Sequence, residues 1–278
     1  MRTLSRLLLV LLLLSAGLSV SAAEPLKVIL LPFTNTATLM KVHQPIRQHL
    51  QAALGRPVEL YTSADFPAHF DEVRRGAFDV AITGPHFGAW AVDHGHRGLL
   101  RYRPNLSPLL AVRKDSNITG PAQLRGKKVV LSNRLSTSSL GGERWLVEAG
   151  LVAGRDYTLS VSPTHTTAIM AVAMGEADAA ITTHTPIQQA PADIRDRIAE
   201  VVSPIAVPHL FTVANARMSA DEAAEIKAAL LSFESSPEGR AFFAETGYEG
   251  YVELTAADVR AMQPTVELLM RLVEAPKP

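Results

Sequence analysis

The sequence contains no cysteine in its 278 residues, and this absence excludes several kinds of site. A chain without cysteine has no disulfide bond, no thiol nucleophile and no thiolate-bound metal. It also cannot be anchored to a membrane through a lipid on a cysteine that follows an export signal. If the chain is exported, we expect it to be free in its compartment and to fold on its hydrophobic core alone.

An excess of charge of either sign is also missing. The chain has 27 basic and 27 acidic residues. A protein without a basic surplus does not attract nucleic acid or anionic lipid by its overall field, so we expect neither as a partner. If the ligand is an anion, local dipoles must bind it.

Only one long apolar run is present, and it lies near the N-terminus. Arg2 and Arg6 come first, Leu7–Leu14 is wholly apolar, and small residues follow at Val20–Ala23. This is the pattern of a secretory signal peptide, and the run is short for a membrane span. We therefore predict a signal peptide at residues 1–23, a periplasmic location and no membrane insertion of the mature chain. Cleavage would leave 25 basic residues against 27 acidic ones, a net charge near −2.

The remaining chain alternates short β-branched runs with helical patterns, and the alternation occurs twice. The first series ends near Tyr102, and a second begins near Pro108. Gly76–Ile82 and Gly175–Ile181 are similar in sequence, with a helical pattern before each, which indicates one local unit used twice. Alternating strands and helices predict a mainly parallel sheet with helices on both faces, so two series predict two α/β lobes.

The predicted lobes divide the chain into three pieces after the signal peptide. We assign residues 24–107 and 208–278 to lobe one and residues 108–207 to lobe two. The chain would then cross between the lobes near Ser107–Ala111 and Ile205–Phe211, and these crossings would form a hinge.

Hydroxyl side chains follow five of the predicted strands, where an open α/β sheet binds its ligands. The five segments are Pro32–Thr36, Thr83–Pro85, Ser132–Ser139, Ser162–Thr167 and Thr182–Thr185. Helix N-termini at these points offer free backbone N–H groups and a positive dipole end, which bind an anion without lysine or arginine. An ordinary helix cap explains the hydroxyl at any single point equally well. The run Ser136–Ser139 is the strongest signal, since a cap needs one hydroxyl only.

Histidines and aromatic residues add candidates of a second kind. His165 stands where a helix is predicted to begin, and it would either cap that helix or donate a hydrogen bond to an oxyanion. His94 and His96 are spaced as a metal pair, but no His-rich or acid-rich segment accompanies them, so we expect no metal and no cofactor. Four aromatic residues that would contact an organic substituent, or form core, lie near the predicted ends of lobe-one strands: Phe33, Phe66, Phe87 and Trp90.

Three ordered motifs are shared with a known family. They are Tyr61–Phe66 with Asp79–Pro85, Leu124–Val130 with Ser136–Ser138, and His165–Ala180. In this order they resemble the phosphate-, phosphite- and phosphonate-binding family of ABC-transporter periplasmic proteins, over nearly the whole mature chain. The resemblance implies the type II periplasmic-binding-protein architecture, in which two lobes close on a ligand and deliver it to an ABC permease in the inner membrane.

The resemblance also implies a set of ligand-binding residues. Ser136, Thr137, Ser138 and His165 correspond to the residues that hold phosphonate or phosphite oxygens in the family. Closure of the lobes would add Thr34 and Thr83 from lobe one.

Two positions depart from the family pattern. A lobe-one aromatic residue that is often tyrosine corresponds to Phe66, which lacks the phenolic donor. Binders of aminophosphonates have an acidic residue about 20 positions after the histidine, and Thr185 stands there in this chain. A ligand without an amine, such as phosphite, phosphate or a simple alkylphosphonate, therefore fits better.

The sequence thus predicts a monomeric binding protein for a small oxyanion. We expect no enzymatic activity, because the motifs Gly-x-Ser-x-Gly and His-Glu-x-x-His and paired carboxylates after strands are absent. Two alternatives share the fold and stay open. One is a ligand-sensing partner of a membrane signalling protein, and the other is a binder of sulfonate, nitrate or a metal oxyanion.

Overall fold

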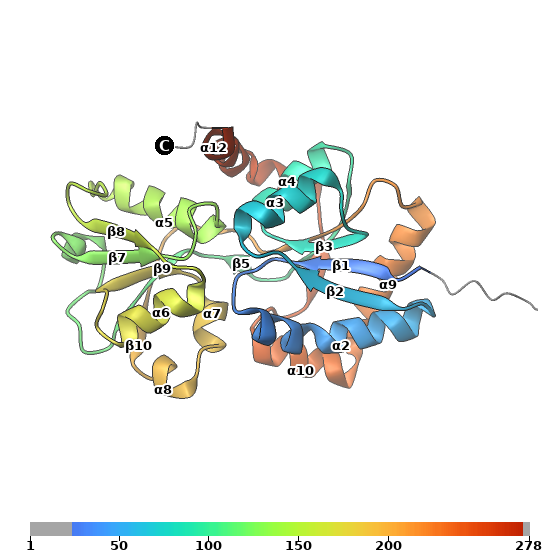
Figure 1. Cartoon of the computed structure of the whole chain (residues 1–278), viewed down its shortest axis with the longest axis horizontal. Helices are drawn as coiled ribbons and strands as arrows, with labels where there is room; N and C mark the ends of the chain where they lie inside the picture. The colour runs from blue at the N-terminus through green and yellow to red at the C-terminus, as the bar shows by residue number, and fades with distance from the viewer. Residues whose placement is uncertain (1–23, 275–278) are drawn as a thin grey trace, which may run out of the picture.

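Two sheets, each covered by helices on both faces, lie one beyond the other along the long axis of the molecule (Figure 1). The computed structural model describes residues 24–274, so the predicted signal peptide at residues 1–23 lies outside the described part. Within residues 24–274, no helix is long and apolar enough to cross a membrane.

Lobe one contains a six-stranded sheet in the order β13-β4-β12-β3-β1-β2. Strand β1 pairs in parallel with β2 and β3, and β12, β4 and β13 add antiparallel pairs. The strands are β1 (Leu26–Leu30), β2 (Val58–Thr62), β3 (Val80–Thr83), β4 (Arg97–Tyr102), β12 (Phe211–Ala214) and β13 (Tyr251–Glu253). The helices are α2 (Thr36–Leu54), α3 (Phe66–Arg75), α4 (Pro85–Asp93), α9 (Ala220–Ser235), α10 (Pro237–Thr246), α11 (Ala256–Ala261) and α12 (Gln263–Glu274).

Lobe two contains a five-stranded sheet in the order β10-β6-β9-β7-β8. Strands β7, β8 and β9 are parallel, and β6 runs antiparallel between β9 and β10. The strands are β6 (Leu109–Arg113), β7 (Lys128–Leu131), β8 (Thr158–Val161), β9 (Ala179–Thr182) and β10 (Ile198–Val202). A short 3₁₀ turn (Pro121–Leu124) precedes the helices α5 (Thr137–Glu148), α6 (His165–Ala173), α7 (His184–Gln188) and α8 (Ala192–Arg195). The two α/β lobes expected from the sequence are confirmed, but each sheet is mixed rather than mainly parallel: three parallel strands form one side of it and antiparallel strands form the other.

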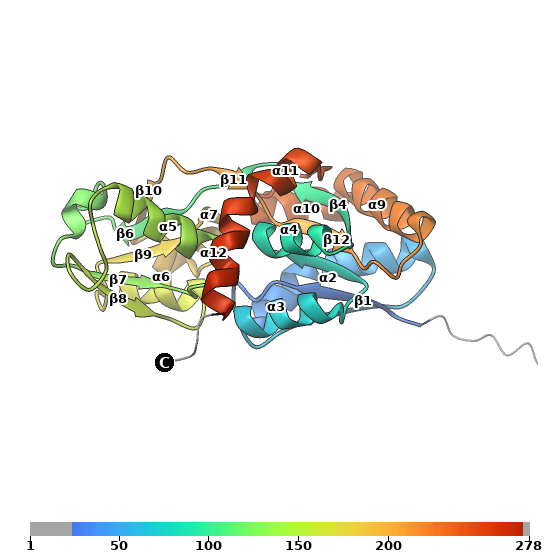
Figure 2. The same ribbon diagram turned by 90° about the horizontal axis from the view of Figure 1, so that it is seen from above.

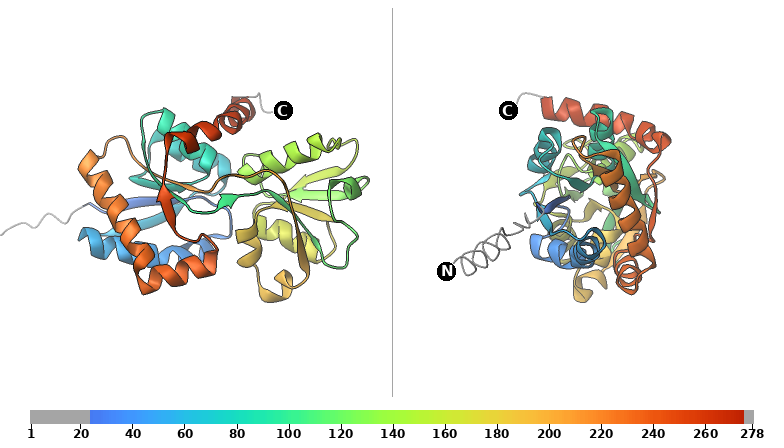
Figure 3. Two further views of the ribbon diagram at one scale, coloured as in Figure 1. Left: turned by 180° about the vertical axis from the view of Figure 1, so that it is seen from behind. Right: turned by 90° about the vertical axis from the view of Figure 1, so that its right-hand side faces the viewer.

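Two short strands lie where the chain passes between the lobes. β5 (Asn105–Leu106) and β11 (Val207–Pro208) pair antiparallel as a two-stranded ribbon. Seen from behind, the crossings run between the two sheets (Figure 3, left). The sequence did not predict these strands as such; of the proposed boundaries, 107/108 lies just after β5 and 207/208 falls within β11.

The similar segments Gly76–Ile82 and Gly175–Ile181 adopt the same local structure in the two lobes. Gly76 and Gly175 follow α3 and α6 with φ of 62° and 79°, a left-handed conformation that glycine adopts at little cost. Directly before each strand begins, an aspartate accepts a backbone N–H from the neighbouring strand: Asp79 from Lys27 at 2.7 Å, and Asp178 from Lys128 at 2.8 Å. The sequence similarity therefore marks one helix–turn–strand unit used twice.

A break separates the last two helices of the described chain. The sequence pattern predicts one helix over Ala256–Val273, but the structure has α11 and α12 with a break at Met262. Pro264 explains the break, since it has no N–H to donate to the carbonyl oxygen of Arg260, four residues earlier. The separate α12 packs on α4 of lobe one and α5 of lobe two, and it lies across the junction of the lobes (Figure 2).

Candidate functional site

A small cavity lies between the two lobes and is lined by residues of both. The space that the centre of a water-sized sphere can occupy in it is about 40 Å³. Because a single water needs roughly 10–15 Å³ by this measure, the cavity suits a small ligand only. Lobe two contributes mainly polar residues, namely Ser136, Thr137, Ser138, His165, Thr183, Thr185 and Pro186. Lobe one and the crossing β5 contribute Leu31, Phe33, Phe66, Gly84, Leu106, His209, Leu210 and Tyr248.

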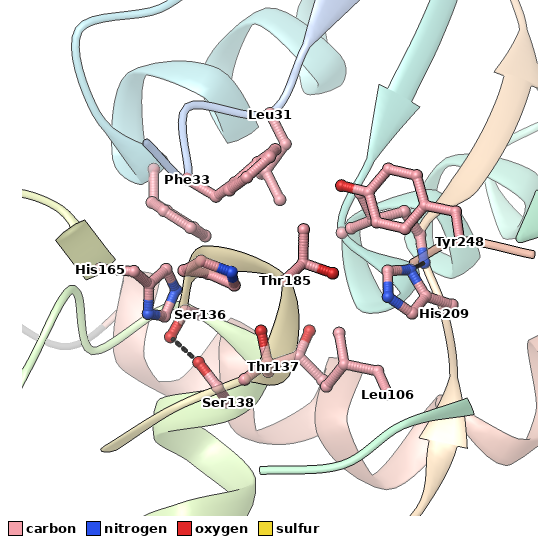
Figure 4. Close-up of a pocket in the computed structure, with 15 residues that line it drawn as sticks. Leu31, Phe33, Leu106, Ser136, Thr137, Ser138, His165, Thr185, His209 and Tyr248 are labelled. Carbon is pink, nitrogen blue, oxygen red and sulfur yellow. Dashed lines mark hydrogen bonds between the residues drawn. The ribbon is translucent and has the colours of Figure 1, made fainter. Parts of the chain in front are cut away.

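The N-terminus of α5 forms the hydroxyl-rich wall. Ser136 is the N-cap, and its Oγ accepts the N–H of Ser139 at 3.1 Å and lies 3.1 Å from Oγ of Ser138 (Figure 4). The amides of Thr137 and Ser138, in the first turn, have no partner among the described residues, as expected at a helix start. These groups are buried, so the positive end of the helix dipole meets the cavity with little screening by water.

His165 begins α6, and the structure fixes both of its ring nitrogens. Nε2 lies 3.0 Å from Oγ of Ser132, and Nδ1 lies 3.0 Å from Oγ1 of Thr182. Burial lowers the pKa of His165 to about 4, so the ring is neutral at pH 7 and carries one N–H. The predicted hydrogen bond from His165 to an oxyanion would therefore replace one of these two contacts with hydroxyl groups.

Three sets of hydrogen bonds join the lobes around the cavity. Thr34 Oγ1 of lobe one lies 3.0 Å from Thr166 Oγ1 of lobe two. His86 at the start of α4 contacts the hydroxyl of Thr137 and the carbonyl oxygen of Leu135. On the other side, Thr185 donates its hydroxyl to the carbonyl oxygen of Thr246 at 3.2 Å. These contacts describe a closed arrangement of the lobes.

An apolar wall completes the cavity on the side of lobe one. Leu31 and Phe33 follow β1 (Figure 4). Phe66 begins α3 after β2, so all three lie beyond the carboxyl ends of strands. Phe66 meets the ring of His165 edge-on, with 6.5 Å between ring centroids. Of the other aromatic candidates, Phe87 and Trp90 pack in the core of lobe one and do not line the cavity.

The structure brings together five of the seven residues predicted for the site. Phe66, Ser136, Thr137, Ser138 and His165 line the cavity.

Two predicted residues lie outside it. Thr34 is used in the contact with Thr166, and Thr83 is fully buried at the end of β3, where its hydroxyl lies 2.8 Å from Nε2 of His69. Each is next in sequence to a residue that lines the cavity, but neither lines it.

His209 and Tyr248 line the cavity and were missed by the sequence analysis. His209 precedes an antiparallel strand, and Tyr248 lies in a loop after α10, so neither follows a strand of the parallel series. One signal for Tyr248 was available, since the surrounding Gly247-Tyr248-Glu249-Gly250 indicates a tight turn.

No charged residue lines the cavity. The lining residues include no lysine, arginine, aspartate or glutamate. Burial lowers the pKa of His209 to about 3, so this ring is neutral at pH 7, as His165 is. Within residues 24–274, no group of three His, Cys, Asp or Glu side chains is placed to hold a metal ion. The site therefore offers dipoles and hydrogen-bond donors for binding.

Comparison with known proteins decides the family. Residues 28–259 match a family described as periplasmic substrate-binding proteins of phosphonate ABC transporters. The chain belongs to this family. The resemblance seen in the sequence motifs is thereby confirmed, and the protein is a periplasmic substrate-binding component of the ABC phosphonate transporter family, whose members serve transport.

Solved structures of similar proteins show the same fold. A binding protein component of an ABC phosphonate transporter from Pseudomonas aeruginosa has a TM-score of 0.76 and 15% identity, covering 91% of this chain and 90% of that chain. PhnD1 from Prochlorococcus marinus, solved in complex with methylphosphonate, has a TM-score of 0.73 and 17% identity, covering 89% and 99%. The aliphatic sulphonate binding protein SsuA from Escherichia coli has a TM-score of 0.62 and 19% identity, covering 91% and 94%.

Proposed function

We propose that this family member captures a small phosphorus oxyanion between its lobes, with phosphite, phosphate or a simple phosphonate as the ligand. The observation that carries the proposal is the small uncharged cavity at the N-terminus of α5, lined by Ser136, Thr137 and Ser138. The protein would act as a monomer after export by residues 1–23, and an inner-membrane permease would receive the anion.

The lobe-two wall suits an oxyanion because it offers donors without counter-charge. Hydrogen bonds to a charged acceptor contribute about 1.5–3 kcal/mol each, roughly twice the value for neutral pairs. The free amides of Thr137 and Ser138 would donate to ligand oxygens, and the helix dipole adds to their effect. The Ser138 hydroxyl would donate to the ligand after releasing Oγ of Ser136, whose own proton goes to Ser139. His165 would join them after releasing Ser132 or Thr182. Thr34 would then contribute to closure through Thr166 rather than through the ligand, and Thr83 would act through its contact with His69.

The lobe-one wall favours an anion with one substituent other than oxygen. Leu31, Phe33 and Phe66 offer no hydrogen bond, so an oxygen placed against them would lose its hydration without compensation. The hydrogen of phosphite or the methyl group of methylphosphonate would meet no such penalty. Among the three ligand types, we therefore expect phosphite or methylphosphonate to bind more tightly than phosphate. An ammonium group would find no carboxylate in the cavity lining, which argues against aminophosphonates.

A thermal-shift and calorimetry panel tests the proposal on the purified mature protein. The ligands are phosphite, phosphate, methylphosphonate, 2-aminoethylphosphonate, sulfate, taurine and nitrate. A ligand at a hundredfold excess over its dissociation constant stabilises the folded state by about 2.7 kcal/mol. We expect phosphite or methylphosphonate to give the largest shift. A response to taurine alone would replace the phosphorus ligand by a sulfonate, and no response to any anion would overturn the proposal.

Variants in the first turn of α5 test the location of the site. Ser138→Ala should weaken binding of the preferred anion by about tenfold, because a charge-assisted hydrogen bond is lost. Ser139→Ala is the comparison in the same turn: Ser139 does not line the cavity and only accepts the hydroxyl of Ser136 at 2.8 Å, so this variant should weaken binding less than Ser138→Ala. Equal effects of the two substitutions would move the site away from this helix end.

A further inference from the structure

Tyr248 and His209 are polar side chains of lobe one that line the cavity (Figure 4). The Tyr248 hydroxyl and Nε2 of His209 have no hydrogen-bond partner among the described residues. We propose that they are the lobe-one hydrogen-bond donors to the ligand, through the Tyr248 hydroxyl and the Nε2–H of His209. The inference rests on the proposed function and assigns these two residues to the anion site.

Tyr248 is buried with its hydroxyl at the cavity. Only 1% of the residue is exposed, and its ring stacks on Tyr102 with 4.0 Å between centroids. The hydroxyl points toward the centre of the cavity (Figure 4) and makes no hydrogen bond within residues 24–274. Burial raises the pKa of this phenol, so it keeps its proton and remains a donor. Because this hydroxyl opens on the cavity rather than being enclosed by protein, a ligand oxygen in the cavity can accept its hydrogen bond.

The loop that carries Tyr248 is wound tightly around it. Gly247 and Gly250 have φ of 71° and 107°, and Glu249 has φ of 58°, the one non-glycine residue with positive φ in the described part of the chain. For a non-glycine residue such as Glu249, a positive φ costs of order 1 kcal/mol or more, and it is found mainly where the surrounding structure enforces it, often at functional sites. Arg103 holds the loop in this conformation. Its guanidinium donates to the carbonyl oxygen of Glu249, and its backbone N–H donates to the carbonyl oxygen of Gly250 at 2.9 Å.

The tautomer of His209 follows from its backbone contact. The N–H of Leu210 donates to Nδ1 at 2.8 Å, so Nδ1 must be an acceptor. Burial, aided by the charge of Arg101, lowers the pKa of His209 to about 3, so the ring is neutral. Its single proton therefore sits on Nε2, at the far edge of the ring from the main chain. Nε2 has no described partner, and the ring stands edge-on to Tyr248 with 5.0 Å between centroids.

The two donors occupy a different side of the cavity from Ser136 and Ser138 (Figure 4). Phe66 lacks a phenol, and Tyr248 brings one from a distant part of the same lobe. A ligand held at α5 in the open protein would gain the Tyr248 and His209 contacts only on closure. These contacts would thus couple ligand binding to closure of the lobes.

Calorimetry on matched tyrosine variants tests the role of Tyr248. With the anion that binds wild-type protein best, Tyr248→Phe should weaken binding by about 10- to 100-fold, as expected for one hydrogen bond to a charged acceptor. Tyr251→Phe is the control, because Tyr251 is buried in the same aromatic stack, 5.3 Å from Tyr102, and does not line the cavity. It should leave the affinity within about twofold of wild type.

Nitrogen NMR of the wild-type protein tests His209 without a substitution. Nδ1 should give the signal of an unprotonated nitrogen and Nε2 that of a protonated one, and the Nε2–H proton should move downfield when the anion binds. A wild-type protein that binds no anion of the panel overturns both the proposed function and this inference. Anion binding that Ser138→Ala weakens and Tyr248→Phe does not, or a His209 Nε2–H signal that the anion leaves unmoved, overturns this inference alone.

Discussion

His86 of lobe one and Thr137 of lobe two are joined by a 2.9 Å hydrogen bond between Nδ1 and Oγ1. The other ring nitrogen, Nε2, lies 2.7 Å from the carbonyl oxygen of Leu135, which can only accept. Because burial lowers the pKa of His86 to about 4, the ring is neutral at pH 7 and carries its proton on Nε2. Nδ1 therefore accepts, and the hydroxyl of Thr137 donates to His86. In the closed protein this hydroxyl holds the lobes together, and its proton is not free for a ligand.

Thr137→Val should weaken anion binding by about 1–3 kcal/mol, or roughly 5- to 150-fold. The substitution removes the interlobe hydrogen bond and leaves Nδ1 of His86 buried without a partner, so the closed state loses stability relative to the open state. Calorimetry with the preferred anion measures the effect.

A double-mutant cycle distinguishes this interlobe role from direct ligand contact. Thr137→Val and His86→Leu should be non-additive by about 1 kcal/mol in binding free energy, because each removes the same bond. Thr166→Val breaks the separate contact with Thr34 and should be additive with Thr137→Val. Additive costs for the His86 pair would show that Thr137 acts on the ligand alone.

Much of the lobe-two site could be predicted because it follows local rules. Ser136–Ser138 and His165 come directly after strands of a parallel series, and the carboxyl ends of such strands meet at one edge of a sheet. Their places in the chain therefore predict their places in space. The similar segments Gly76–Ile82 and Gly175–Ile181 likewise predicted both lobes, since each makes the same helix–turn–strand unit.

The lobe-one side of the site is built from segments that lie far apart in the sequence and meet only in the folded protein. His209 reaches the cavity because the chain crosses back through β11, and Tyr248 because α9 and α10 bring the chain under the same sheet. Thr34 and Thr83 follow the expected strands, yet their hydroxyls are taken by Thr166 and His69. Strand order and side-chain partners of this kind are tertiary properties, which hydrophobic periodicity does not encode.

The folded protein should lose stability in mildly acidic solution, at pH values above those at which carboxyl groups usually titrate. Burial lowers the pKa of five histidines to about 3 or 4, namely His43, His69, His86, His165 and His209. Their ordinary pKa is about 6.5, so the unfolded chain binds more protons between pH 6.5 and 4. The contribution of these neutral rings to the free energy of unfolding is fully present above pH 6.5. It is lost as the pH falls toward 4, at up to about 1.4 kcal/mol per pH unit for each histidine.

Urea unfolding at pH 7, 6, 5 and 4.5 measures this dependence. His43→Gln removes one buried ring that does not line the cavity, so it should reduce the slope by the contribution of one proton whatever its effect on stability at pH 7. A free energy of unfolding that stays constant from pH 7 to 5 would contradict the neutral state inferred for these rings.

Gly142→Ala should disturb lobe two through the packing of α5. A Cβ at Gly142 would lie 2.4 Å from Cγ2 of Ile181 in β9, so the helix must move away from the sheet. Overpacking of this kind costs about 1–3 kcal/mol, and the displaced helix would carry its N-terminus away from the cavity. Thermal unfolding should show a lower Tm, and calorimetry a weaker affinity. Gly120→Ala is the control, since the nearest atom would be 3.7 Å away and both properties should stay close to wild type. Wild-type behaviour of Gly142→Ala would mean that α5 is not held as closely as the structure indicates.

Thr185 offers a direct test of the uncharged character of the cavity. Thr185→Asp would introduce a carboxylate into a buried lining that contains no cation to compensate it, and it would oppose an anionic ligand. Thr185→Asn has nearly the same shape without the charge, and both variants lose the hydroxyl that donates to Thr246. The ratio of their affinities for the preferred anion therefore isolates the electrostatic effect. We expect the aspartate variant to bind at least tenfold more weakly than the asparagine variant at pH 7.5, and the gap to narrow as the pH falls and the carboxyl group is protonated. Equal affinities at pH 7.5 would place the anion far from Thr185 and would argue that the ligand does not occupy this cavity.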